Sequence, residues 1–133
     1  MVAQLAAQAA PPLEGIVNAL IRPLTAGMLE DFPGSVAKLR FLVRLSFDRS
    51  PYLENIVEDS FSIFRPLLRR ALPGIDERTL MRRWHFAADL AQHALANALD
   101  IYLPAGSTNA PRRAEFERFL CDLSGFIAGG LRG

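Results

Sequence analysis

The chain has 133 residues, of which 50% are hydrophobic and 22% charged, and its formal net charge is +1. This length fits one domain that can bury a core without metals or disulfides. The single cysteine excludes an internal disulfide framework and a cysteine-rich zinc module. The near-neutral charge argues against electrostatically driven binding to nucleic acid or to an anionic membrane.

No apolar run reaches the roughly 20 residues that a bilayer requires. The first ten residues carry no cationic segment of the kind that begins a secretory signal. We therefore expect a cytoplasmic protein without a membrane partner.

Proline and glycine divide the chain into segments of about 15 to 26 residues, which is helix length rather than strand length. No segment alternates polar and apolar residues, and β-branched residues are sparse. The sequence therefore predicts an all-α fold, an antiparallel bundle of five to six helices.

The first long helix is predicted over residues 12–30, with a kink near residues 19–22 because Pro23 removes a backbone donor. The next is predicted over residues 35–47 with Ser35 as its N-cap. Apolar residues cover more than one face of this second helix, which indicates a central and largely buried element.

The third helix is predicted to follow Ser50-Pro51, which has N-cap and N1 residue types, and to end at Pro73-Gly74. Asp76 is the predicted N-cap of the longest helix, residues 77–102. A loop is expected over residues 104–109, and Pro111 can open the last helix, which extends to about residue 131.

Three segments stand out in the second half of the chain, namely Leu72-Pro73-Gly74-Ile75-Asp76, Arg83-Trp84-His85-Phe86 and Ala91-Gln92-His93-Ala94-Leu95. In this order and at these helix lengths they resemble the C-terminal regulatory domain of TetR-type transcriptional repressors. Residues 39–45 and 64–72 upstream and 115–120 downstream fit the neighbouring helices of such domains, so the resemblance spans roughly residues 11–131.

Repressors of this type begin with a DNA-binding head that the residues before Pro11 cannot form. The resemblance implies that residues 1–10 are a linker-helix remnant or a disordered start, and that residues 11–133 form one effector-binding and dimerisation domain. DNA would be bound only through a head absent from this chain. The alternative is a headless interaction protein that heterodimerises with an intact regulator. A small helical enzyme is the third and last-placed hypothesis, and we expect no enzymatic activity, because no acid–base pair or nucleophile stands out.

The resemblance also implies that the last two long helices pair with a second copy as a four-helix bundle. The other possibility is that their apolar residues pack only within their own subunit. The candidate interface residues of the homodimer are His93, Phe116, Phe119, Leu120, Leu123, Ser124, Phe126 and Ile127.

The family binds small, often apolar effectors in a cavity inside the helical domain. Aromatic residues at helical spacing are more often ordinary core, so both interpretations stay open. The candidate ligand-binding residues are Met28, Phe47, Phe61, Phe64, Trp84, His85, Phe86 and Asp89.

Three residues have side chains that can bind metals, namely His85, Asp89 and His93 at positions i, i+4 and i+8 of one helix. The two histidines would lie about 12 Å apart along the axis, too far to share one ion. We expect no metal and no cofactor, with Asp89 hydrogen-bonded to a histidine at an interface or pocket wall. Cys121 lies among apolar residues, and we expect a buried, inert thiol.

Overall fold

The computed structural model describes residues 2–8, 10–98, 101 and 113–133, without the side chain of Val57. Within these residues the chain forms six helices and no strand, so the predicted all-α fold is confirmed. The helices are α1 (Val2–Ala6), α2 (Leu13–Leu24), α3 (Phe32–Phe47), α4 (Pro51–Ala71), α5 (Glu77–Ala96) and α6 (Arg113–Arg132). The predicted helix end at residue 102, the loop over residues 104–109 and the start at Pro111 lie outside the described residues.

Helix α2 is shorter than the helix predicted over residues 12–30. Pro23 lies in its last turn, so the proline precedes the end of the helix instead of kinking a longer one. The backbone N–H of Thr25 bonds to the carbonyl of Arg22, and Gly27 then adopts a positive φ of 80°. A left-handed residue cannot continue a helix, and glycine adopts that conformation without steric cost.

Helix α3 begins three residues before the predicted N-cap. Asp31 is the cap, and its carboxylate accepts a hydrogen bond from the backbone N–H of Gly34 at 3.2 Å. A Cβ atom at Gly34 would lie only 2.2 Å from an Asp31 oxygen, so glycine permits this close cap. The sequence pattern predicted Ser35 as the N-cap of α3 because it did not reveal the hydrogen bond between Asp31 and Gly34.

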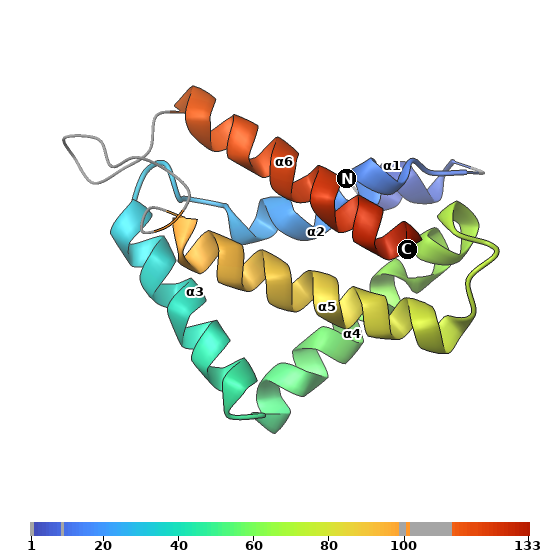
Figure 1. The fold of residues 1–133 in the computed structure, drawn as a ribbon, viewed down its shortest axis with the longest axis horizontal. Helices are drawn as coiled ribbons and strands as arrows, with labels where there is room; N and C mark the ends of the chain where they lie inside the picture. The colour runs from blue at the N-terminus through green and yellow to red at the C-terminus, as the bar shows by residue number, and fades with distance from the viewer. Residues whose placement is uncertain (1, 9, 99–100, 102–112) are drawn as a thin grey trace.

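The prediction that this helix is central and largely buried is wrong. Only Phe32, Val36 and Leu39 are buried, whereas Phe47 is 86% exposed. Helix α3 lies at the edge of the molecule, and its main contact is with α5 (Figure 1). A helix packed on one side buries one stripe, whatever apolar residues occupy the rest of its surface.

The caps of α4 and α5 differ in strength. Ser50 occupies the predicted N-cap position of α4, but its side chain makes no capping hydrogen bond. Asp76 caps α5 as predicted, accepting from the Thr79 backbone N–H at 2.9 Å and from its hydroxyl at 2.7 Å. The first of these bonds gives a partner to the Thr79 backbone N–H, which has none within the first turn of α5.

Helices α3 and α4 form a V whose corner is the turn at residues 48–50, and α5 crosses the open side of that V (Figure 1). Helix α6 lies along α5 and also contacts α2. The core between them is one cluster that includes the fully buried Ile16, Leu68, Trp84 and Leu95. None of the described helices combines the length and hydropathy needed to span a bilayer.

The short helix α1 is attached to this core. Leu5 is buried and lies against Gly15 of α2. The Arg70 guanidinium at the end of α4 donates to the carbonyl oxygens of Ala6 and Gln8, at 3.2 and 2.8 Å. These bonds connect the C-terminal ends of α1 and α4. The sequence-based domain boundary at residue 10 stays a prediction.

The cap of α5 should make stability depend on pH in acid. The hydrogen bonds from Thr79 lower the pKa of Asp76 below its ordinary value of 3.8. A carboxylate with a lowered folded-state pKa stabilises the fold above its ordinary pKa, and this contribution is lost as the pH falls through the lowered value. Asp76→Ala should therefore lower the free energy of unfolding in urea at neutral pH, with the difference from the wild type vanishing in strong acid. Asp59→Ala, on an exposed face of α4, is the control, and a pH-independent difference for Asp76→Ala would contradict the prediction.

Candidate functional site

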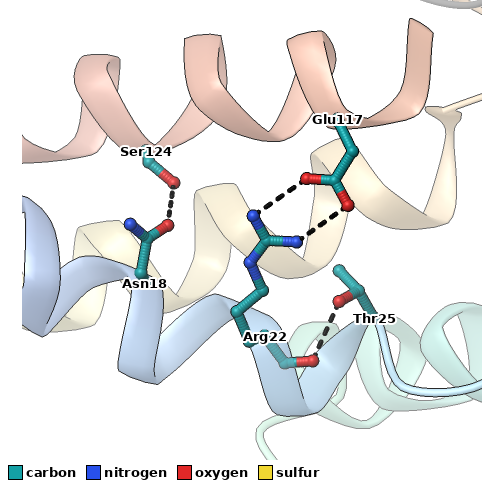
Figure 2. Close-up of polar contacts among 5 residues, drawn as sticks. All are labelled: Asn18, Arg22, Thr25, Glu117 and Ser124. Carbon is teal, nitrogen blue, oxygen red and sulfur yellow. Dashed lines mark hydrogen bonds and ion pairs between the residues drawn. The ribbon is translucent and has the colours of Figure 1, made fainter. Parts of the chain in front are cut away.

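Two side-chain pairs connect α2 and α6 (Figure 2). The Arg22 guanidinium donates to both oxygens of Glu117, at 3.1 and 3.0 Å. One turn earlier on α2, Asn18 accepts a hydrogen bond from Ser124 at 3.0 Å. The bond from Arg22 lowers the pKa of Glu117, and the same bond raises the pKa of Arg22. These contacts hold one face of α6 against α2.

The C-terminal end of α6 is held as well. Arg132 donates to Glu14 on α2 at 2.8 Å. From α5, Arg83 donates to the carbonyl oxygens of Leu131 and Arg132, at 2.9 and 3.0 Å. A cation at this position satisfies carbonyls that the helix itself leaves unpaired. Helix α6 is therefore attached at both ends to its own chain.

The candidate interface residues separate into two groups. Phe116, Leu120, Leu123, Ser124 and Ile127 are buried within their own chain and leave little surface for a second copy to cover, and their place in an interface stays a prediction. Their spacing of three and four residues forms the single stripe that packs against α2 and α5. For example, Phe116 meets Phe32 edge-on with ring centroids 6.4 Å apart.

The other candidate interface residues remain at the surface. Phe126 is 71% exposed, His93 is exposed and Phe119 is half-buried. Whether they contact a second copy stays a prediction.

An apolar groove runs along the outer side of α5 and α6. Its larger part has a volume of about 610 Å³, and its lining includes Leu90, Ala94, Phe119 and Phe126. A smaller part of about 130 Å³ shares Leu90 and Phe126 and adds Phe86. Leu90 and Ala94 were not among the predicted site residues, although Phe86, Leu90 and Ala94 recur every four residues as a second apolar stripe.

Cys121 lines the larger part of this groove, and its thiol is exposed. The prediction of a buried thiol is therefore wrong. Its apolar sequence neighbours are buried because they lie on the other side of α6.

Three glycines lie on the same exposed side of α6, at positions 125, 129 and 130. A Cβ atom at any of them would meet no atom within 4 Å. Glycine inside a helix costs roughly 0.5–1 kcal/mol relative to alanine. Because no neighbour in the described chain requires these small residues, packing within the subunit does not explain them.

The candidate ligand-binding residues occupy three different places. Met28, Phe61, Phe64 and Trp84 are buried in the core. His85 and Asp89 line a small polar pocket at the corner of the V formed by α3 and α4. Phe47 and Phe86 are 86% and 63% exposed, so the expectation that they line an interior cavity is wrong. Whether any of the eight residues contacts an effector stays a prediction.

The core aromatics contain one unpaired polar group. The Phe64 and Trp84 rings are tilted by 34° with their centroids 5.0 Å apart. Trp84 is fully buried, and its Nε1 atom has no hydrogen-bond partner. Buried polar groups are nearly always paired, and leaving a donor unpaired costs about 1–3 kcal/mol.

The corner pocket has a volume of about 260 Å³ and lies where the end of α3, the start of α4 and the middle of α5 meet. Ser46 donates to Asp89 at 3.4 Å, and the Nε2 atom of His85 is buried without a partner. The expected bond between Asp89 and a histidine does not occur among the described contacts. Among the residues that the structure describes, no three histidine, cysteine or acidic side chains are arranged to hold a metal ion.

The chain is thus a helical domain with an open apolar face on its last two helices. The sequence model of the family described as "Tetracyclin repressor-like, C-terminal domain" matches residues 18–130. The match covers most of the chain, and the chain belongs to this family of regulator domains. No curated protein and no solved structure is similar enough to count as a match.

The contact between α2 and α6 should be measurable but modest. Both Arg22 and Glu117 have side chains more than a third exposed, so water screens their attraction. In a double-mutant cycle with Arg22→Ala and Glu117→Ala, we expect a coupling of about 0.5 kcal/mol in urea denaturation. The control cycle uses Arg78 and Glu30, which share no described ion pair, and should give no coupling. Equal coupling in both cycles would contradict the assigned contact.

Proposed function

We propose that this chain is the effector-sensing and homodimerisation domain of a transcriptional repressor. In the family that it belongs to, such a domain regulates DNA binding by a separate N-terminal head. Regulation requires that the effector bind one arrangement of the dimer more tightly than another. We assign the domain no catalytic step, because its family consists of regulators.

The apolar groove between α5 and α6 carries the dimerisation part of the proposal. Phe86 and Phe126 remain exposed although the rest of α6 is tightly held, and the groove between them is lined mainly by apolar atoms. Contiguous exposed apolar patches mark interaction sites. The three exposed glycines would allow the backbone of a second α6 to approach closely, which would explain their position.

A second copy is the partner that the groove fits best, because two-fold dimers use the same patch twice. The same face offers large side chains and the space left by the glycines, so the side chains of one copy can fit the space on the other. An intact regulator of the same family would present a similar face. The headless heterodimerising protein therefore stays the alternative prediction.

Phe126→Arg should convert a dimer to a monomer. The side chain is 71% exposed in the single chain, so the substitution leaves the core intact while placing a charge in the interface. Sedimentation or light scattering should show half the wild-type mass at micromolar concentration. Tyr52→Arg on α4, at a residue 68% exposed, is the matched control and should retain the dimer. An unchanged mass for Phe126→Arg, or a wild-type monomer, would remove this face from the proposal.

The sensing part of the proposal places a small, mostly apolar effector beside Trp84. Supporting it are the ring of Phe64 beside Trp84, the apolar residues Met28 and Phe61 in the same core cluster, and the unpaired indole N–H. An acceptor group on the effector would take up that hydrogen bond. Binding sites for small molecules typically combine an apolar lining with a few such polar groups.

Trp84 is the only tryptophan, so its fluorescence can report the effector directly. Among apolar compounds that raise the unfolding temperature, those with a carbonyl should shift Trp84 emission. Trp84→Phe keeps an aromatic ring and removes the N–H, and should weaken binding of those compounds by about tenfold, equivalent to about 1.4 kcal/mol. The matched hydrocarbons lack the carbonyl and cannot bond to the indole N–H, so the loss of that N–H should not change their affinity. Equal weakening of both classes would show that the indole contributes only its ring.

A further inference from the structure

The corner pocket combines charged groups of both signs in a small volume. Arg49 follows α3, Glu54 lies in the first turn of α4 and Asp89 projects from α5. Ser46, Ser50 and His85 also line the pocket, and Leu53 is its only apolar lining residue. This composition distinguishes it from the apolar groove on α5 and α6.

The charges in this pocket are not neutralised by described ion pairs. None of the ion pairs among the described residues includes Arg49, Glu54 or Asp89. Asp89 accepts one long hydrogen bond, from Ser46 at 3.4 Å. Ser50 does not use its side chain to cap α4, although it occupies the cap position. The pocket therefore retains both donors and acceptors for a ligand.

The backbone sets these groups around one space. Arg49 has a φ of 55°, a left-handed conformation that residues other than glycine rarely adopt. This residue reverses the chain between α3 and α4, so that residues 46, 49, 50, 53 and 54 line one pocket together with residues from α5. Leu53 is buried and fixes the first turn of α4 against the core.

A ligand with one sign of charge would not match this lining. A simple anion would be attracted by Arg49 but would lie near two carboxylates. A simple cation would be attracted by Glu54 and Asp89 but would leave Arg49 without a partner. We propose that the corner pocket binds a small zwitterion, whose ammonium group lies at Glu54 and Asp89 and whose carboxylate lies at Arg49.

This assignment is independent of the apolar effector beside Trp84, because the two places share no residue. The Ser50 hydroxyl, which makes no capping bond, can donate to the ligand carboxylate, and charge-assisted bonds of this kind are the strong ones. The volume of about 260 Å³ suits a ligand of the size of a free amino acid or a short ω-amino acid.

Calorimetric titration with matched probes tests the proposal. The zwitterions are glycine, 4-aminobutyrate and 6-aminohexanoate, each compared with the amine and the carboxylate of the same chain length. At least one zwitterion should bind with a Kd about tenfold lower than both of its matched compounds. Absence of binding by all three at millimolar concentration, or equal binding by the matched amine or carboxylate, would overturn the proposal.

Two substitutions locate the binding. Arg49→Gln and Asp89→Asn should each weaken zwitterion binding by about tenfold. Both side chains are exposed, so the variants should fold, and the unfolding temperature checks this directly. Arg78→Gln and Asp59→Asn make the same charge changes outside the pocket and should leave the affinity unchanged. Unchanged affinity for either pocket variant would overturn the site.

Failure of this proposal would be distinct from failure of the sensing function. A dimer that forms through the groove and an apolar compound that binds beside Trp84 would leave that function intact when no zwitterion binds. Conversely, if a zwitterion binds and both pocket variants weaken its binding, the proposed site holds even when the protein proves to be a monomer.

Discussion

The orientation of α6 determines which surfaces the molecule offers to others. A straight helix that packs on one side buries a single stripe, and in α6 that stripe contains Phe116, Leu120 and Ile127. Exposing these side chains to water would be costly, so their burial sets the orientation of α6, and the Arg22–Glu117 pair and the bonds from Arg83 are consistent with it. Everything on the opposite side, including Phe126 and three glycines, is therefore left to solvent or to another molecule.

The fold class and the starts of α4 and α5 could be predicted because they depend on local chemistry. Asp76 caps α5 and Pro51 opens α4 as the residue types indicate. The start of α3 could not be predicted, because it depends on how closely the Asp31 side chain approaches Gly34. The end of α2 at Leu24 depends in the same way on a turn that needs Gly27, whereas the periodicity continues beyond it.

The site residues were harder to predict because burial depends on neighbours that the pattern does not identify. Apolar residues on α6 suggested an interface, but a stripe that faces the chain's own core has the same spacing as one that faces a partner. Exposure separates them, with Phe126 outside and Leu120 inside. The corner pocket was missed except for His85 and Asp89, since Arg49, Ser50 and Glu54 reach it only because of the turn between α3 and α4.

One turn of α5 brings the three places together. Successive residues of a helix point about 100° apart. Trp84 is accordingly in the core, His85 lines the corner pocket and Phe86 lines the groove. A ligand that favours a slightly rotated or shifted α5 must therefore act on the groove as well, because α5 contributes side chains to each. Coupling between sites is a difference in binding free energy between two arrangements. Helix α5 is the element that the core beside Trp84, the corner pocket and the groove share.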